Sequence, residues 1–172
     1  MPFAVPWTDA VSPELERNTV AYFRQTRAEV STEHWDVPMA VLVDGTAVGV
    51  CAVTADGFPT RRIVSTGSWL GRRHQGRGLG REMRAAALHL IFAGFDADVA
   101  RTAAWHDNAA SLGVTRSLPY VQTGWSRQSR RGVLDTMLEF TMTRDQWEPM
   151  RRSDIQLVGV DAVVDQLALR RA

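Results

Sequence analysis

The sequence contains no lysine, because all 20 residues counted as Lys plus Arg are arginines. A P-loop needs a lysine on the nucleotide phosphates, and a pyridoxal phosphate enzyme needs a lysine for its Schiff base. Both kinds of site are therefore excluded. The net charge is only +1, which gives no overall positive field to gather nucleic acid, so we expect no nucleic-acid partner.

Cysteine is almost as scarce, since Cys51 stands alone within an apolar segment. One cysteine cannot form an internal disulfide, and this setting predicts a buried thiol without a catalytic role. The histidines are not spaced as metal ligands, so we expect no metal site. Neither a run of about 18 apolar residues nor a signal-peptide pattern is present, which predicts a soluble, cytoplasmic protein without a membrane partner.

The 172 residues, of which 45% are hydrophobic, fit a single domain spanning 1–172. A short N-terminal segment, 1–11, precedes the first predicted helix, and a tail, 151–172, follows the last predicted strand. Apolar residues in the tail are compatible with two structures. They form either a strand and a helix that close the core, or a surface that covers a partner subunit in a homodimer.

Helices are predicted where breaker-free runs follow caps, and strands where apolar and β-branched residues cluster between turn signals. The predicted helices are 12–30, 79–92 and 108–116, and the predicted strands are 39–43, 47–53, 63–70, 99–105, 122–127 and 133–141. The apolar face of the second helix is predicted to comprise Met83, Ala86, Ala87, Leu90 and Ile91. Hairpins are predicted at Asp44-Gly45-Thr46 and around Arg130-Arg131-Gly132.

The order strand 63–70, helix 79–92, strand 99–105 forms a βαβ unit, in which the two strands run parallel with a right-handed crossover. The remaining strands are expected to pair antiparallel. The predicted fold class is therefore α/β, in the α+β sense of a mixed sheet that is largely antiparallel around a central parallel βαβ unit.

A glycine-rich turn, Gln75-Gly76-Arg77-Gly78-Leu79-Gly80, joins the strand and the helix of this unit. Free backbone N–H groups and the helix dipole attract an anion there, and glycine allows a diphosphate to touch the backbone. The surrounding arginines could contact phosphates: Arg72, Arg73, Arg77 and Arg81. The alternatives are a dinucleotide site, disfavoured because Arg81 and Met83 stand where its third glycine is needed, and a turn that serves only packing.

Preceded by Ser68-Trp69-Leu70, this turn resembles the signature of the GNAT acetyltransferase superfamily. Asp107-Asn108-Ala109-Ala110-Ser111 and Leu118-Pro119-Tyr120 are similar to a second conserved stretch in the branch that contains ribosomal-protein N-terminal acetyltransferases, although Pro119 replaces the usual glycine. The resemblance covers roughly residues 14–148. It implies a GNAT-like fold and acetyl-CoA as co-substrate. The sequence departs from the family at its start, where we expect the N-terminal strand to be missing or shortened.

The resemblance also implies where acetyl-CoA binds. The Leu70 backbone would face the thioester and the pantetheine arm, and Asn108 would hydrogen-bond that arm. The pyrophosphate would be held by main-chain amides of Gln75, Gly76, Arg77, Gly78, Leu79 and Gly80.

The predicted reaction is acetyl transfer to a primary amine by direct attack, which needs no enzyme nucleophile but does need a base. Ser111 would protonate the departing thiolate. Glu82 is the first candidate base, and the others are His74, His106 and Asp107. The acceptor pocket, or else the core, would be lined by Phe3, Trp7 and Trp35.

The acceptor is either a protein N-terminus or a small amine, including amine-bearing antibiotics. A non-catalytic module that binds acyl-CoA is the alternative function, favoured by the missing N-terminal strand. The stretch 127–131, rich in arginine, is either solvated or a contact for RNA or an acidic peptide.

Overall fold

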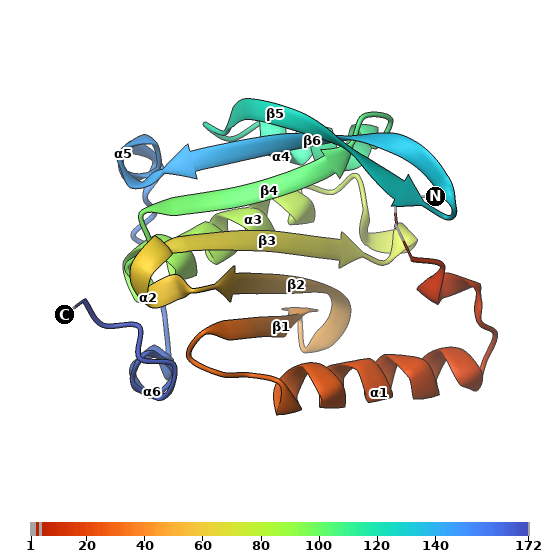
Figure 1. Cartoon of the computed structure of the whole chain (residues 1–172), viewed down its shortest axis with the longest axis horizontal. Helices are drawn as coiled ribbons and strands as arrows, with labels where there is room; N and C mark the ends of the chain where they lie inside the picture. Colours follow the sequence, from red (N-terminus) through yellow and green to blue (C-terminus); the bar gives the residue numbers. More distant parts are fainter. Residues whose placement is uncertain (1–2, 4, 172) are drawn as a thin grey trace.

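Six strands form one sheet in the order β1-β2-β3-β4-β6-β5 in the computed structural model, which describes residue 3 and residues 5–171 (Figure 1). The strands are β1 His34–Val43, β2 Thr46–Asp56, β3 Ile63–Leu70, β4 Val99–Trp105, β5 Val121–Arg130 and β6 Val133–Thr143. β3 and β4 are parallel, and each other neighbouring pair is antiparallel. The predicted mixed sheet with a central parallel pair is therefore confirmed.

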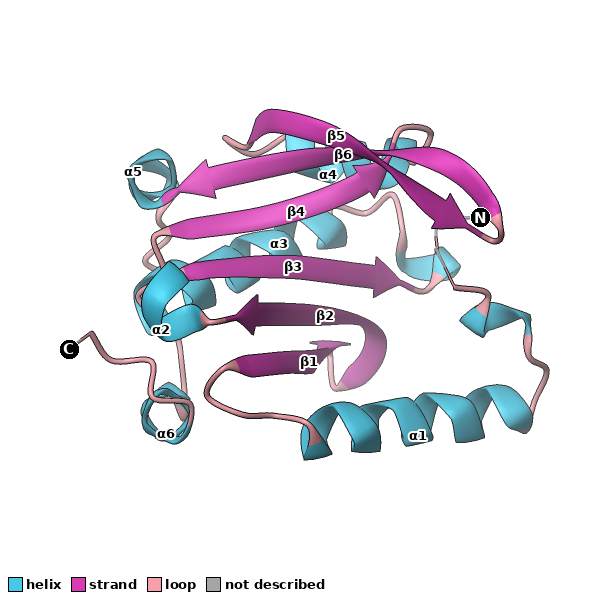
Figure 2. Ribbon diagram, in the orientation of Figure 1, coloured by secondary structure: helices cyan, strands magenta, loops and turns pink. Residues whose placement is uncertain are grey.

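The helices are α1 Glu14–Ala28, α2 Phe58–Arg61, α3 Leu79–His89, α4 Ala109–Arg116, α5 Arg144–Trp147 and α6 Val160–Gln166. Figure 2 shows α3 crossing behind the sheet between β3 and β4, whereas α1 lies beside the outer strand β1. A π-helical turn, Leu90–Gly94, continues α3. The sequence did not predict α2 and α5, because four residues are too few to show a helical period.

β1 begins at His34, five positions before the predicted start at Met39. Pro38 lies inside the strand and made the run look broken. A proline is tolerated here because β1 is an edge strand of the sheet, where only one side of the backbone enters the ladder. Before α1, residues 5–13 contain the 3-10 turn Trp7–Asp9 and no strand.

The predicted apolar face of α3 is confirmed except at Ala86, because Ala87 and Ile91 are buried in the main core cluster and Met83 and Leu90 pack against it. The buried residues of α3 include Arg84, Ala85, Ala87 and Leu88, whereas Ala86 is exposed. The prediction considered apolar residues alone, so it missed Arg84, a charged residue whose side chain turns inward. Arg84 thus points at the sheet.

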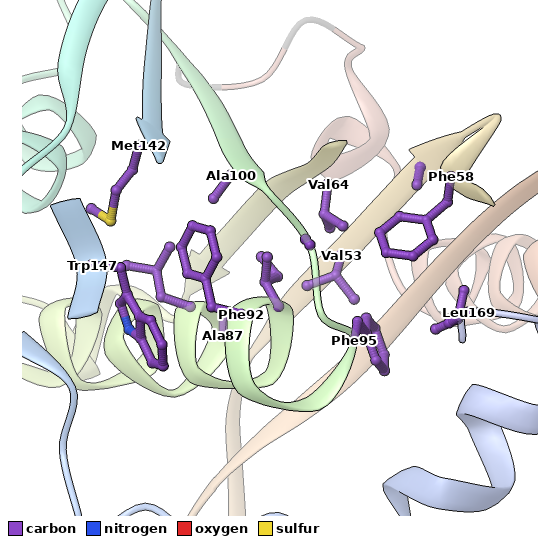
Figure 3. Packing of buried hydrophobic residues seen from close by; sticks show 14 of the residues in the cluster. Val53, Phe58, Val64, Ala87, Phe92, Phe95, Ala100, Met142, Trp147 and Leu169 are labelled. Atoms are coloured by element: carbon purple, nitrogen blue, oxygen red, sulfur yellow. The ribbon is translucent and has the colours of Figure 1, made fainter. Parts of the chain in front are cut away.

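The core lies between α3 and the sheet, and several aromatic rings fill it (Figure 3). Trp35 is fully buried, and its ring centroid lies 5.7 Å from that of Phe58 and 5.6 Å from that of Phe95. Phe92 stacks on Trp147 with centroids 5.2 Å apart. Burial of each such side chain stabilises the fold by about 1.5–3 kcal/mol.

The C-terminal tail closes this core. It supplies α6 but no strand among residues 151–171, and it buries Val164, Leu167 and Leu169 in the main cluster. Arg62 Nη1 donates to the Leu169 carbonyl oxygen at 2.6 Å. Of the two predicted structures, the helix that closes the core is present.

His89 gives the fold a pH dependence. Its ring is 7% exposed, and burial lowers its pKa, as does Arg151, against an opposing effect of Asp154. Neutral His89 therefore stabilises the folded state fully above the unfolded pKa of about 6.5, and this contribution is lost as the pH falls through the lower folded pKa.

We expect the melting temperature of the wild type to fall more steeply between pH 7.5 and 5 than that of His89→Gln, which cannot titrate. Thermal unfolding at a series of pH values checks this. Parallel curves for the two proteins would show that His89 does not contribute.

Candidate functional site

The glycine-rich turn has the geometry of an anion site. Gly76 and Gly78 have positive φ angles of 70° and 82°, and a Cβ added at either would meet nothing within 4 Å. Gly78 is the N-cap of α3 and offers no side-chain cap, so N–H groups in the first helical turn lack intrahelical partners. The turn is therefore an open cradle of backbone donors at the positive end of a helix.

Two contacts fix the position of this turn. Gln75 Nε2 donates to the Leu70 carbonyl oxygen at 2.8 Å, which ties the turn to the end of β3. A Cβ on Gly80 would lie 3.0 Å from Val114 Cγ2, so glycine at this position allows α3 to approach α4 closely. Gln75 and Gly80 thus hold the turn in place against β3 and α4.

The arginines around the turn leave the cradle positively charged. The side chains of Arg72, Arg77 and Arg81 are exposed and form no ion pair with a carboxylate of the described chain. Arg73 Nε donates to His74 Nε2 at 2.9 Å. These guanidinium groups are available to a phosphorylated ligand.

β3 and β4 are paired only along their first residues and then separate. They are paired from Ile63 and Val99 to Thr66 and Thr102, after which β3 pairs with β2 alone and β4 with β6 alone. Figure 1 shows β4 diverging from β3 toward their carboxyl ends. We call the opening between residues 67–70 and 103–105 the fork. Its facing backbone edges lack ladder partners, so they can hydrogen-bond an extended chain that carries amides.

α4 begins beside the fork, directly after β4. Asn108 is its N-cap, and Oδ1 of Asn108 accepts from the Ser111 backbone N–H at 3.1 Å. This leaves the side-chain NH₂ of Asn108 as the group that can donate to a ligand. Ser111 is half-buried in the first turn of the helix.

The four candidate bases named from the sequence are all engaged. Glu82 forms an ion pair with Arg152 of the tail, Asp107 pairs with Arg130 at 2.7 Å, and His106 lies 3.0 Å from Asp135. His74 is the partner of Arg73 noted above. In the hairpin of β5 and β6, Arg130 and Arg131 are likewise held by carboxylates, which supports a structural role for stretch 127–131.

Glu139 on β6 was missed. It pairs in register with Ala103, the first fork residue of β4, and with Gly124 of β5. Phe140 is buried on the α4 side of the sheet, so the alternation of a strand places Glu139 on the opposite face. It is half-buried and forms no hydrogen bond or ion pair within the described chain, not even with Arg101, its diagonal neighbour. A lone carboxylate within an apolar predicted strand was the available signal.

The aromatic residues predicted for the acceptor pocket separate into two places. Trp7 packs between Phe3 and Trp69 with tilted rings, whose centroids lie 5.0 Å and 5.5 Å from that of Trp7. Since Ser68 faces α3, Trp69 lies on the face that also carries Glu139. Trp35 belongs to the core, as described above, and does not line this face.

Within the described residues, no helix is long and apolar enough to span a membrane. The same residues include no cluster of three His, Cys, Asp or Glu side chains that could hold a metal ion.

A family model described as an acetyltransferase (GNAT) domain matches residues 1–120. Among solved structures, Mycobacterium smegmatis RimJ in complex with CoA-disulfide is similar with a TM-score of 0.70 at 17% identity, over 76% of this chain and 63% of RimJ. The spermidine/spermine N-acetyltransferase SpeG from Vibrio cholerae is similar with a TM-score of 0.67 at 11% identity, over 78% of this chain and 81% of SpeG.

The ribosomal-protein-S5-alanine acetyltransferase from Vibrio fischeri has a TM-score of 0.62 at 15% identity, over 80% of this chain and 75% of its own. At these identities the likeness establishes a common fold. The S5 enzyme is named for a ribosomal protein, as is the branch that the second sequence motif resembles.

Proposed function

Because this chain belongs to the GNAT acetyltransferase family and is therefore an acyltransferase, we propose that it moves an acetyl group from acetyl-CoA to a primary amine. The observation that carries this proposal is the continuity of cradle and fork. The glycine cradle follows directly from β3, the strand that forms one side of the fork. A ligand with a diphosphate at one end and an extended, amide-bearing arm fits both.

Each part of the site has a proposed task in binding. Backbone N–H groups of residues 75–80 hold the diphosphate, with exposed arginines beside them. The unpaired backbone of the fork, up to Leu70, holds the arm, and the Asn108 NH₂ donates to it. Acetyl-CoA supplies an activated thioester at the end of this arm. Because the fork holds the arm, the reacting carbonyl would lie within the fork.

Catalysis in this proposal depends on two side chains on either side of the fork. Glu139 lies beside the fork on the face of the sheet opposite α3 and α4, which we call the open face. There it takes a proton from the acceptor ammonium. Ser111, in the first turn of α4, donates a proton to the departing sulfur. Glu82, the base named from the sequence, is less well supported, because its ion pair with Arg152 engages it in fastening the tail.

The acceptor is proposed to approach over the open face, between Trp69 and Glu139. An aromatic side and a free carboxylate suit a primary ammonium on an apolar stem. The similar structures are named for spermidine and for ribosomal protein S5, which supports testing both a polyamine and a peptide N-terminus.

One observation favours the alternative of a non-catalytic acyl-CoA-binding module. Residues 5–13 contain no strand, whereas the family that the sequence resembles has one at this point of the chain. That alternative requires tight cofactor binding without transfer to any amine.

The test combines calorimetry with a transfer assay. We expect acetyl-CoA to bind with micromolar affinity, and thiol release to show transfer to spermidine or to a peptide with a free N-terminus. Ser111→Ala is expected to lower kcat by about 10-fold to 100-fold without changing the affinity for acetyl-CoA. Binding without transfer would favour the alternative, and absence of binding would contradict both.

A further inference from the structure

Arg84 is a buried cation at the closed end of the fork. Its side chain points from α3 into the sheet and is 3% exposed. Nη1 donates to Thr102 Oγ1 at 2.8 Å, and Nη2 donates to Ser68 Oγ at 3.3 Å. Thr102 is the last residue of β4 that pairs with β3, and Ser68 belongs to the β3 side of the fork. The guanidinium therefore bridges both strands where they begin to separate.

This cation has no counter-ion. No carboxylate of the described chain pairs with it, and its Nε is buried without a hydrogen-bond partner. The charge of Arg84 acts on the pKa of Cys51, which lies opposite Ser68 in the sheet. Burial raises the pKa of the Cys51 thiol and Arg84 opposes this, but the pKa remains raised. The thiol is therefore neutral near pH 7 and does not balance the guanidinium.

A purely structural role does not require the charge. The bonds to Thr102 and Ser68 need only N–H donors, and these donors need not be charged. A buried and unpaired charge is costly, and such groups concentrate where a reaction develops charge of the opposite sign. An anion inside the fork would satisfy Arg84.

We propose that Arg84 stabilises the thiolate that acyl transfer releases in the fork. The inference rests on the proposed function, which places the thioester there. The nitrogen lone pair of the acceptor forms a C–N bond to the carbonyl carbon, and the C–S bond breaks with its electron pair leaving on sulfur. Glu139 takes one proton from the acceptor ammonium before the attack, and the negative charge on sulfur lies near Arg84 until Ser111 delivers a proton to it. The second proton, which nitrogen loses as the amide forms, replaces the one that Ser111 gave.

The first test measures binding rather than activity. CoA with a free thiol is titrated into the protein by calorimetry between pH 6.5 and 9.5, with desulfo-CoA as the matched ligand. Because Arg84 favours the thiolate, the pKa of the bound thiol lies below the value of about 8.5 that is usual for a thiol. CoA affinity should then rise about 10-fold with pH toward that value, whereas desulfo-CoA affinity should not.

Two variants separate charge from structure. Arg84→Gln removes the charge and shortens the side chain, and we expect it to lose the rise in CoA affinity and to lower kcat by about 10-fold to 100-fold. Arg84→Lys keeps the charge and should retain most of both. Melting temperatures of all three proteins monitor the fold.

The outcomes distinguish the two proposals. If the wild type fails to bind CoA, the proposed function itself fails. If it binds CoA and transfers acetyl groups but its CoA and desulfo-CoA affinities change alike with pH, the role of Arg84 is overturned and the function stands. An Arg84→Gln protein with wild-type kcat would overturn it as well.

Discussion

Gly78→Asp is expected to lower the affinity for acetyl-CoA at least about 100-fold. The carboxylate would stand in the open cradle at the N-terminus of α3, where a Cβ meets nothing within 4 Å. There it would repel the diphosphate and occupy the positive end of the helix dipole. Two unit charges about 4 Å apart near a surface repel by about 4 kcal/mol, and screening by water and salt reduces this toward the expected loss.

Gly78→Asn is the matched control for this substitution. Asparagine has nearly the size of aspartate and tolerates the positive φ of 82° at this position comparably well, but it carries no charge. We expect its affinity for acetyl-CoA to fall about 10-fold at most, as measured by calorimetry. Equal losses in both variants would mean that space or backbone shape, rather than anion binding, governs the turn.

Glu139→Gln is expected to lower kcat by about 10²-fold to 10⁴-fold, the usual contribution of a general base. The amide keeps the shape of the side chain but cannot accept the proton of the acceptor ammonium. The affinity for acetyl-CoA should not change, because Glu139 lies on the face of the sheet away from α3 and α4. Steady-state kinetics with saturating acetyl-CoA, together with calorimetry, measures both quantities.

Glu82→Gln provides the comparison within the same chain. Its carboxylate pairs with Arg152 on the outside of the molecule, so we expect a near-normal kcat and little loss of stability. The opposite result, with Glu82→Gln inactive and Glu139→Gln active, would place the base on α3, as the sequence suggested.

The sequence predicted the local parts of this molecule well. Strands 63–70 and 99–105 and the intervening turn were recovered because their signals are local: β-branched runs and a cluster of glycines before a helix. The fork could not be predicted, since it depends on how far two strands remain paired after Thr66 and Thr102. The number of residues over which two strands pair cannot be predicted from the sequence of either strand alone.

The candidate site was predicted in part for a similar reason. Motifs identified the cradle and the pair Asn108 and Ser111, because each motif lies within a short stretch of the chain. Glu139 and Arg84 became candidates only when the structure revealed which charges lack partners, and that depends on every other side chain nearby. Arg84 did leave a signal, because it lies three residues before Ala87 and four before Leu88, on the buried side of the helix.

The order β4-β6-β5 has a consequence for how the protein is made. β6 fills the slot between β4 and β5, so one edge of β4 remains without its partner until residue 143 has left the ribosome. Leu167 and Leu169, which complete the core, emerge later still. The nascent chain therefore carries its glycine-rich turn before it gains Glu139, the strand β6 and the core residues Leu167 and Leu169.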